Sequence, residues 1–358
     1  MTSPIISEAV KTLVERRDLT RIEAAAAMEA IMSGAATNAQ IAAFLTALRM
    51  KGETVEELIG FAQVMRQKAV RVRTRGAEVS ASLTGTDREM LIDTCGTGGD
   101  ASGTFNVSTA TAFVVAGAGL KVAKHGNRSA SSLCGSADVV EALGVSLELT
   151  PQQVARCVDE IGIGFLYAPL LHTAMKHVMA ARREMGIRTV FNLLGPLTNP
   201  ASANAQVIGV ASESLTEPLA RVLAELGTLR AFVVHGADGL DEISNTGESR
   251  LSEVREGLVR TYSVGPEDFG LPRASIAELQ GGDRQQNAQI IREILAGSVG
   301  ARRNIVLMNA AAALVAGARA QELKEGVRLA AESIDSGAAR DRLERLVGFS
   351  QKLAADKT

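Results

Sequence analysis

Aromatic side chains are scarce in this sequence, and tryptophan is absent. Aromatic residues make up 3% of the 358 residues, whereas 46% of the residues are hydrophobic. A hydrophobic core must therefore consist mainly of Ala, Leu, Val, Ile and Met, which suits packed helices and buried parallel strands. The length exceeds that of one typical core and predicts two domains, or one large domain with an appendage.

A strong excess of charge of either sign is also missing. The 38 Lys and Arg residues stand against 40 Asp and Glu residues, so the formal net charge is −2 at pH 7. This balance disfavours a nucleic-acid-binding protein that acts through bulk positive charge. It permits a local basic pocket, because a site for a small ligand needs only a few cations.

The sequence has only three cysteines and no long hydrophobic run. Cys95, Cys134 and Cys157 are widely spaced, which disfavours a disulfide framework or a zinc site and favours a reducing compartment. No stretch reaches the roughly 18 apolar residues that a membrane helix needs. The N-terminal segment MTSPIISEAVKTLVERRDL carries charge throughout and has no apolar signal core. We therefore expect a cytoplasmic globular protein with no membrane contact.

Residues 1–72 have the pattern of short helices. Apolar residues recur at helical spacing, Thr20 and Glu23 form a capping-box pattern, and Thr54 is a further cap. Four short helices predict a small all-α N-terminal subdomain, which part of residues 172–200 completes. One face of this subdomain serves either as an oligomer contact or only to pack on its own chain.

The pattern changes after a polar connection at residues 73–89. Short apolar runs then alternate with helical stretches, and the final third is again helical. This alternation predicts a larger α/β domain over residues 90–358, with a mainly parallel central sheet flanked by helices. The strands are expected at residues 90–92, 120–123, 164–166, 205–210 and 231–235.

The sequence DTCGTGGD, residues 93–100, directly follows the first expected strand. Its three glycines let the backbone turn sharply and offer bare N–H groups to an anion. The sequence NVST, residues 106–109, then opens a helix whose N-terminus is a natural phosphate seat. The Lys-Ser/Thr ending of a Walker loop is missing, and the dinucleotide fingerprint does not fit. Alone, the segment is compatible with a phosphate loop or a plain turn.

Two further polar segments follow expected strands. KHGNRSASS, residues 124–132, lies at the carboxyl end of its strand, where open α/β sheets bind ligands. Its cations, imidazole, amide and hydroxyls favour an anion or substrate site over a solvated loop. Asp241 and Glu242 follow the last expected strand and can hold magnesium, which prefers oxygen ligands. Most acidic pairs are merely solvated, but the phosphate loop elsewhere favours the metal.

The fourth segment is HTAMKHVMAARREMGIRTVFNLLGPLTNP, residues 172–200. His172, Arg182 and Arg183 are expected on one helix, and residues 192–200 are expected to form a constrained, mostly uncharged loop. An Arg beside an apolar wall suits an aromatic carboxylate, because guanidinium pairs bidentately with carboxylate. A surface Arg on a helix that packs on the core is equally compatible with the pattern.

These four segments, in this order, resemble the anthranilate phosphoribosyltransferase family of tryptophan biosynthesis. The resemblance covers nearly the whole chain, and the combination of GTGGD, NVST, KHGNR and RTVFNLLGPLTNP is specific. It implies transfer of the 5-phosphoribosyl group from 5-phosphoribosyl-1-diphosphate to the amine of anthranilate, with release of pyrophosphate. It also implies two Mg²⁺ ions per subunit, a homodimer joined through the N-terminal helices, and no nucleic-acid or membrane partner.

The resemblance also assigns site residues. It places anthranilate at Gly96, Asn127 and Arg182, and magnesium at Ser108, Asp241 and Glu242. It places the diphosphate substrate at Gly96, Gly99, Asp100, Thr104, Asn106, Val107, Ser108, Thr109, Lys124, His125, Gly126, Asn127, Arg128, Ser129, Ala130, Ser131, Ser132 and Ser136. His125 is the one candidate base, since no Ser–His–Asp set or paired acid and base is evident. Thr173 departs from the proline expected in the family, but this change removes no ligand.

Two alternatives remain at this point. A pyrimidine nucleoside phosphorylase would share the fold, but the Asp241-Glu242 pair and the Arg182 and Asn127 set speak against it. A non-catalytic relative that binds nucleic acid on the same scaffold would want a basic surface, which the net charge of −2 disfavours.

Overall fold

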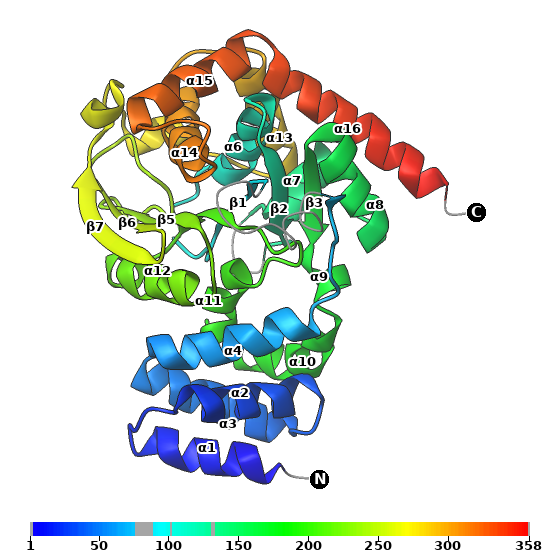
Figure 1. The fold of residues 1–358 in the computed structure, drawn as a ribbon, viewed down its shortest axis with the longest axis vertical. Coiled ribbons are helices and arrows are strands. Elements are labelled where there is room, and N and C mark those ends of the chain that lie inside the picture. Colours follow the sequence, from blue (N-terminus) through cyan, green and yellow to red (C-terminus); the bar gives the residue numbers. More distant parts are fainter. Residues whose placement is uncertain (1–2, 76–88, 101, 130–132, 357–358) are drawn as a thin grey trace.

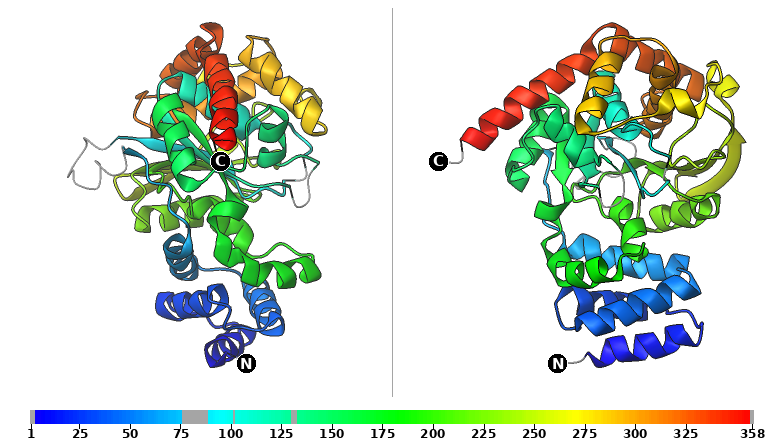
Figure 2. Two further views of the ribbon diagram at one scale, coloured as in Figure 1. Left: turned by 90° about the vertical axis from the view of Figure 1, so that its right-hand side faces the viewer. Right: turned by 180° about the vertical axis from the view of Figure 1, so that it is seen from behind.

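The structure, a computed structural model, describes residues 3–75, 89–100, 102–129 and 133–356. It has two parts stacked along its longest axis: a helical bundle that contains the N-terminus, and a larger part built on a sheet (Figure 1). Figure 2 shows the same arrangement from the side and from behind. The predicted fold class, a small all-α subdomain followed by an α/β domain with a mainly parallel sheet, is confirmed.

Four helices form the N-terminal bundle. They are α1 (Pro4–Val14), α2 (Arg21–Met32), α3 (Asn38–Lys51) and α4 (Val55–Lys68). Thr20, Thr37 and Thr54 start α2, α3 and α4, and each side chain accepts a hydrogen bond from the backbone N–H three residues on. The capping box predicted at Thr20 and Glu23 is confirmed, and these caps explain why helices this short begin where they do.

A seven-stranded sheet forms the centre of the larger part. Its strands lie in the order β3-β2-β1-β4-β5-β6-β7, with β1 to β5 parallel and the last two antiparallel. The strands are β1 (Leu91–Gly96), β2 (Lys121–Gly126), β3 (Ile163–Tyr167), β4 (Ala205–Gly209), β5 (Arg230–Gly236), β6 (Ser249–Arg255) and β7 (Leu258–Val264). Each parallel strand overlaps a predicted one, because buried parallel strands read as continuous apolar runs.

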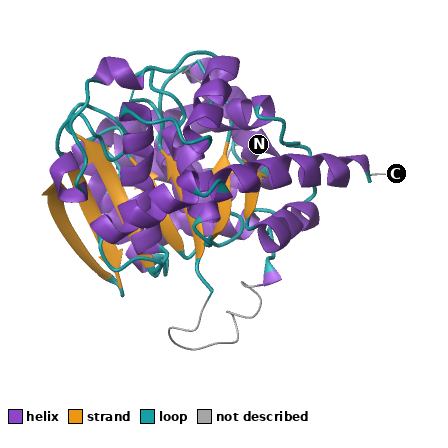
Figure 3. Ribbon diagram, turned by 90° about the horizontal axis from the view of Figure 1, so that it is seen from above, coloured by secondary structure: helices purple, strands orange, loops and turns teal. Residues whose placement is uncertain are grey.

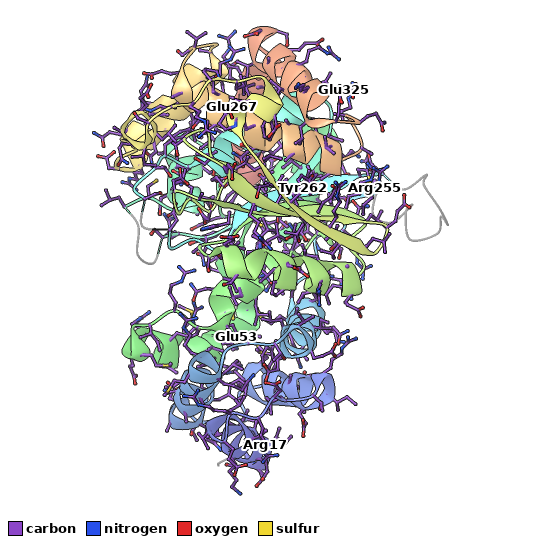
Figure 4. The ribbon with its side chains drawn as sticks, turned by 90° about the vertical axis from the view of Figure 1, so that its left-hand side faces the viewer. Arg17, Glu53, Arg255, Tyr262, Glu267 and Glu325 are labelled. Carbon is purple, nitrogen blue, oxygen red and sulfur yellow. The ribbon has the colours of Figure 1, made fainter. Side chains whose placement is uncertain are left out.

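The antiparallel hairpin β6–β7 is missing from the sequence prediction. Most residues of β7 are exposed or half-buried, so the hairpin lacks an apolar run. Its turn is Glu256 and Gly257, both with positive φ, at 53° and 78°, as two-residue hairpin turns require. Arg255 and Tyr262 lie on this hairpin in the larger part, whereas Arg17 lies at the far end of the bundle (Figure 4).

Helices cover both faces of the sheet (Figure 3). α6 and α14 contact one face, and α12 contacts the other. The helices of this part are α6 (Val107–Gly117), α7 (Ser136–Ala142), α8 (Pro151–Arg156), α9 (Ala168–Leu171), α12 (Thr216–Glu225), α13 (Arg284–Leu295), α14 (Ala301–Ala316), α15 (Leu323–Asp335) and α16 (Ala338–Ala355). Among the described residues, no helix is both long and apolar enough to cross a membrane.

Two helices from the middle of the chain join the bundle: α10 (Lys176–Met185) packs against α2 and α3, and α11 (Val190–Leu197) lies between the bundle and the sheet (Figure 1). Their side chains Val178, Phe191 and Leu194 share one apolar cluster with α1 to α4, β4, β5 and α12. The bundle therefore packs against the face of the sheet that α12 covers. The domain division at residues 73–89 stays a prediction, because most of that connection lies outside the described residues.

Two predictions for residues 172–200 are wrong in detail. α10 begins at Lys176, so His172 precedes the helix. Most of the segment expected as an uncharged loop belongs to α11. The apolar side chains of α11 are buried on the bundle, and this burial outweighs the intrahelical hydrogen bond lost at Pro196.

Candidate active site

The predicted site segments meet at one edge of the sheet. β1, β2, β4 and β5 are parallel, and their ends lie side by side, with Gly96 opposite Gly209 and Gly209 opposite Val234. The glycine-rich, KHGNR and acidic segments therefore leave the sheet at the same edge, where open α/β sheets bind ligands.

The glycine-rich loop brings bare backbone against charged groups. Gly98 and Gly99 have φ values of 62° and 85°, in the left-handed region that side chains disfavour. A Cβ atom on Gly96 would lie 2.7 Å from the Asp241 carboxylate, and one on Gly99 would overlap the guanidinium of Arg188. A side chain at either position would force the Asp241 carboxylate or the Arg188 guanidinium to move.

Two carboxylates accept hydrogen bonds from backbone N–H groups, one in the glycine-rich loop and one at the start of α6. Oδ2 of Asp241 accepts the N–H of Gly98 at 3.0 Å, and Oε1 of Glu242 accepts the N–H of Ser108, in the first turn of α6, at 3.0 Å. Burial raises the pKa of Asp241 to about 7. Burial and the neighbouring Asp241 charge raise the pKa of Glu242 well above its usual value. Both carboxyls therefore lack enough positive charge around them to favour their ionised forms.

This shortage of positive charge fits a magnesium site at the acidic pair. The described residues contain no group of three or more His, Cys, Asp or Glu side chains that could hold a metal. Asp241 and Glu242 would therefore supply only part of the coordination of a magnesium ion. Magnesium commonly binds one or two carboxylates in this way and completes its coordination with water and substrate phosphates.

Lys124 lies beneath the helix N-terminus rather than in solvent. Its ammonium donates to the carbonyl of Thr94 at 2.5 Å and lies 3.3 Å from the hydroxyl of Ser108. Burial lowers the pKa of Lys124, while the nearby Asp93 charge opposes that shift. The cation thus ties β1, β2 and the start of α6 together under the predicted diphosphate seat.

A buried network supports β2 from behind. Both carboxylate oxygens of Asp93 are used: one accepts the N–H of His125 at 3.0 Å, and the other accepts the side-chain amide of Asn199 at 2.8 Å. Asn199 also donates to the carbonyl of Ala123. The network fixes the direction in which the KHGNR segment leaves the sheet.

The imidazole of His125 faces another imidazole. Its Nε2 atom lies 3.2 Å from Nε2 of His172, and it also hydrogen-bonds the backbone of Gly195. Burial lowers the pKa of His125 to about 3 and that of His172 to about 4. Both rings are therefore neutral at pH 7, and one nitrogen of the contact carries the proton while the other accepts it.

Arg182 lies against an aromatic wall. Its Cζ atom is 5.4 Å from the centroid of the Phe191 ring, and burial lowers its pKa. The neighbouring Arg183 is exposed. This difference favours Arg182 as the residue that meets a carboxylate beside an apolar surface.

The rest of the KHGNR segment is held by α7. The guanidinium of Arg128 pairs with Asp138 and Glu141, each at 2.9 Å, so its charge is already balanced.

Ser136 starts α7, and its hydroxyl donates to the carbonyl of Asn127 at 3.4 Å. The backbone N–H of Ser129 is bonded to the same helix. A Cβ atom on Gly126 would overlap the Ser136 hydroxyl. The predicted contacts Ala130, Ser131 and Ser132 lie outside the described residues.

The predicted contacts between the glycine-rich loop and α6 form a polar chain. The Ser102 hydroxyl donates to Asp100 at 2.5 Å and lies 3.2 Å from the hydroxyl of Thr104. Val107 and Thr109 are buried in the first turn of α6. The Thr109 hydroxyl has no hydrogen-bond partner within the described part of the chain, which leaves a buried polar group for a ligand.

Sequence reasoning gave no role to Arg188 or Asn199. Arg188 donates to the carbonyl of Thr97 at 3.0 Å and lies against Gly99. Both residues belong to the RTVFNLLGPLTNP segment, where a cation and amides stand among apolar residues. These isolated polar residues were the only local sign of a role, but their hydrogen-bond partners Thr97 and Asp93 lie far away in the sequence.

Each of the two parts of the fold matches a family model. Residues 7–69 match the family model "Glycosyl transferase family, helical bundle domain", and residues 88–340 match "Glycosyl transferase family, a/b domain". The two matches together cover most of the chain, which is therefore a glycosyltransferase.

Individual relatives show which family of glycosyltransferases this chain belongs to. An anthranilate phosphoribosyltransferase of Symbiobacterium thermophilum is 57% identical over 347 residues, covering 97% of this chain and 98% of the relative. One from Citrifermentans bemidjiense is 56% identical over 355 residues, with 97% and 99% covered. The crystal structure of the Thermus thermophilus enzyme has a TM-score of 0.88 at 44% identity, with 96% and 99% covered. The chain belongs to the anthranilate phosphoribosyltransferase family.

The glycine-rich loop yields a first prediction. Gly99→Ala should weaken the binding of magnesium pyrophosphate at least tenfold, because the new Cβ would displace Arg188 and strain the backbone. Gly98→Ala is the matched control, since its φ is also positive but no atom lies within 4 Å of the added Cβ. Titration calorimetry measures both affinities, and equal losses would contradict the role given to Arg188.

Proposed function

We propose that this enzyme transfers the 5-phosphoribosyl group of 5-phosphoribosyl-1-diphosphate to the amine of anthranilate, releasing pyrophosphate, in tryptophan biosynthesis. The observation that supports the proposal is that two groups of residues in this molecule each suit an anion. The N–H groups of Gly98 and Ser108 suit a diphosphate, and Arg182 beside Phe191 suits an aromatic carboxylate. Related Saccharomyces cerevisiae structures (28% identical) contain PRPP and Mg in one case and 4-fluoroanthranilate in another.

The diphosphate seat combines backbone and side-chain donors. The glycine-rich loop offers N–H groups, α6 offers its N-terminus, and the hydroxyl of Thr109 supplies a further group. Lys124 adds positive charge from below. Because Asp241 and Glu242 now accept the N–H groups of Gly98 and Ser108, the carboxylates and the phosphate oxygens must share or exchange these donors.

Asp241, Glu242 and Ser108 would hold magnesium beside the diphosphate, two ions per subunit. When bound, the metal neutralises charge that develops on the departing pyrophosphate. The two carboxyls contribute by ionising in its field, and their raised pKa values mean that a cation is needed to complete that ionisation.

Anthranilate would bind at Arg182, Asn127 and Gly96. Arg182 holds the carboxylate, Phe191 supplies the apolar wall for the ring, and the amine is thereby directed towards C1 of the ribose. The amine is already nucleophilic and pyrophosphate is a good leaving group, so orientation and charge stabilisation supply most of the catalysis.

His125 fits a positioning role better than that of a base. It is neutral at pH 7, its pKa is lowered to about 3, and its hydrogen bonds run to His172 and Gly195. A base with so low a pKa accepts a proton poorly from an ammonium intermediate. The imidazole pair instead holds the end of β2 against the segment before α10.

We also propose a cytoplasmic homodimer that joins through the N-terminal helices. Ile22 on α2 and Met50 on α3 are 81% and 72% exposed, and Val14 on α1 is also exposed. Apolar side chains of this kind on one small bundle support an interaction surface. Cys95, Cys134 and Cys157 form no disulfide among the described residues, which supports a reducing compartment.

A direct assay tests the proposed function. Purified protein with Mg²⁺, anthranilate and 5-phosphoribosyl-1-diphosphate should quench anthranilate fluorescence and release one pyrophosphate per anthranilate consumed. Omission of either substrate is the control. Turnover of thymidine or uridine with phosphate, in place of this reaction, would reject the proposal.

The carboxylate contact gives a further prediction. Arg182→Ala should raise the KM for anthranilate at least tenfold, because a charge-assisted bidentate contact is lost, and leave the KM for the diphosphate substrate within twofold. Arg183→Ala is the control, because that side chain is exposed. Equal changes in both KM values for Arg182→Ala would remove the carboxylate assignment.

The acidic pair Asp241-Glu242 gives another prediction. Asp241→Asn combined with Glu242→Gln should raise the magnesium concentration for half-maximal rate at least tenfold, since two ligand charges are lost. Binding of Mn²⁺ followed by electron paramagnetic resonance should weaken in parallel. Glu248→Gln changes an exposed carboxylate in the same connection and should alter neither value. Unchanged metal dependence in the double variant would exclude these ligands.

A further inference from the structure

The buried side-chain amide of Asn287 lies outside the predicted site but is hydrogen-bonded to Asn106, a residue of that site. Asn287 lies in the first half of α13 and is 2% exposed. A buried amide is costly unless its groups are hydrogen-bonded, and here both are. Its Oδ1 accepts the N–H of Gly282 at 2.8 Å, and its Nδ2 donates to Oδ1 of Asn106 at 3.0 Å. Asn106 is the residue before α6, so α13 reaches the predicted diphosphate seat.

The bond from Asn287 sets the orientation of the Asn106 side chain. Because Oδ1 of Asn106 accepts the Asn287 amide, its Nδ2 faces the other way and donates to the carbonyl of Cys134 at 3.2 Å. Cys134 is near the start of α7, in the segment that follows KHGNR. The Asn106 amide is therefore used at both ends and bridges two loops of the site.

Asn106 differs from the residues that cap other helices of this chain. Asn is among the best N-cap residues, yet the Asn106 side chain makes no cap bond, and its ψ is 75°. Five other helices begin after a residue with extended ψ, between 158° and 178°, whose side chain accepts an N–H of the first turn: Thr20, Thr37, Thr54, Thr150 and Asp283. α6 begins without such a cap, and the N–H of Ser108 is held by Glu242 instead.

We propose that Asn287 is a positioning residue that holds the Asn106 side chain away from the N-terminus of α6, so that the N–H of Ser108 is left to Glu242 and to the diphosphate that shares this donor. Without Asn287, the Asn106 amide oxygen is free to turn towards the helix start, where it competes with Glu242 and with a phosphate oxygen for the N–H of Ser108. This inference rests on the proposed function and adds a residue that does not itself touch substrate.

The test is a double-mutant cycle on Asn287 and Asn106. Asn287→Leu keeps the branched arrangement of heavy atoms and removes both hydrogen bonds, and Asn287→Ser is a smaller second variant in case the first does not fold. Either should raise the KM for 5-phosphoribosyl-1-diphosphate about fivefold, the equivalent of one N-cap bond. The KM for anthranilate should stay within twofold. In an Asn106→Ala background the same substitutions should change the diphosphate KM less than twofold, because no side chain remains to cap the helix.

Ser333→Ala is the matched structural control. Its buried hydroxyl donates to the carbonyl of Val114 at 2.7 Å, so it ties α15 to the opposite end of α6. This variant should lower the melting temperature while both KM values stay unchanged. Calorimetric titration with magnesium and the diphosphate substrate gives the same comparison without turnover.

Three results would overturn the proposal: an unchanged diphosphate KM in the Asn287 variants, equal rises in both KM values, or the same fold-change with and without Asn106. Failure of the proposed function is separate from these results, since it would appear as absent turnover by the unsubstituted enzyme.

Discussion

Two hydrogen bonds between carboxylates and backbone N–H groups organise this enzyme. Asp241 binds the N–H of Gly98, and Glu242 binds that of Ser108, so the loop after β5 reaches across β4 to the loop after β1 and to α6. The contact requires bare backbone, and Gly209, which lies between them in the sheet, would overlap the Asp241 backbone if it had a side chain. The acidic pair and the proposed phosphate seat are thus assembled as one unit, with the carboxyl groups in positions that suit anions.

Buried asparagines keep this unit in place from behind. Asn199 joins Asp93 to β2 and Asn287 orients Asn106. Asn309 on α14 accepts the N–H of Ile243 and donates to its carbonyl, both at 2.9 Å, directly after the acidic pair. A neutral amide carries a donor and an acceptor and is far less costly to bury than a charge. The helices α13 and α14 therefore support the proposed site through neutral amides.

Much of the fold followed from local patterns. Five apolar runs mark the parallel strands because both of their faces are buried, and Thr20 and Thr54 mark helix starts through their own side chains. The hairpin β6–β7 and helix α11 were missed for opposite reasons. The hairpin is an edge with little apolar content, and α11 is stabilised by partners in the bundle that lie far away in the sequence.

The sequence by itself determined where the proposed site lies in the fold, because the glycines, the acidic pair and the basic segment each stand at the end of a strand. It could not show which atoms meet. That Arg188 lies on Gly99, that Arg128 is already paired with α7, and that His125 faces His172 are results of packing between distant segments. The physical reason is that strand-end placement follows from local burial and chain direction, whereas side-chain pairing depends on the register and layering that only the assembled sheet and helices impose.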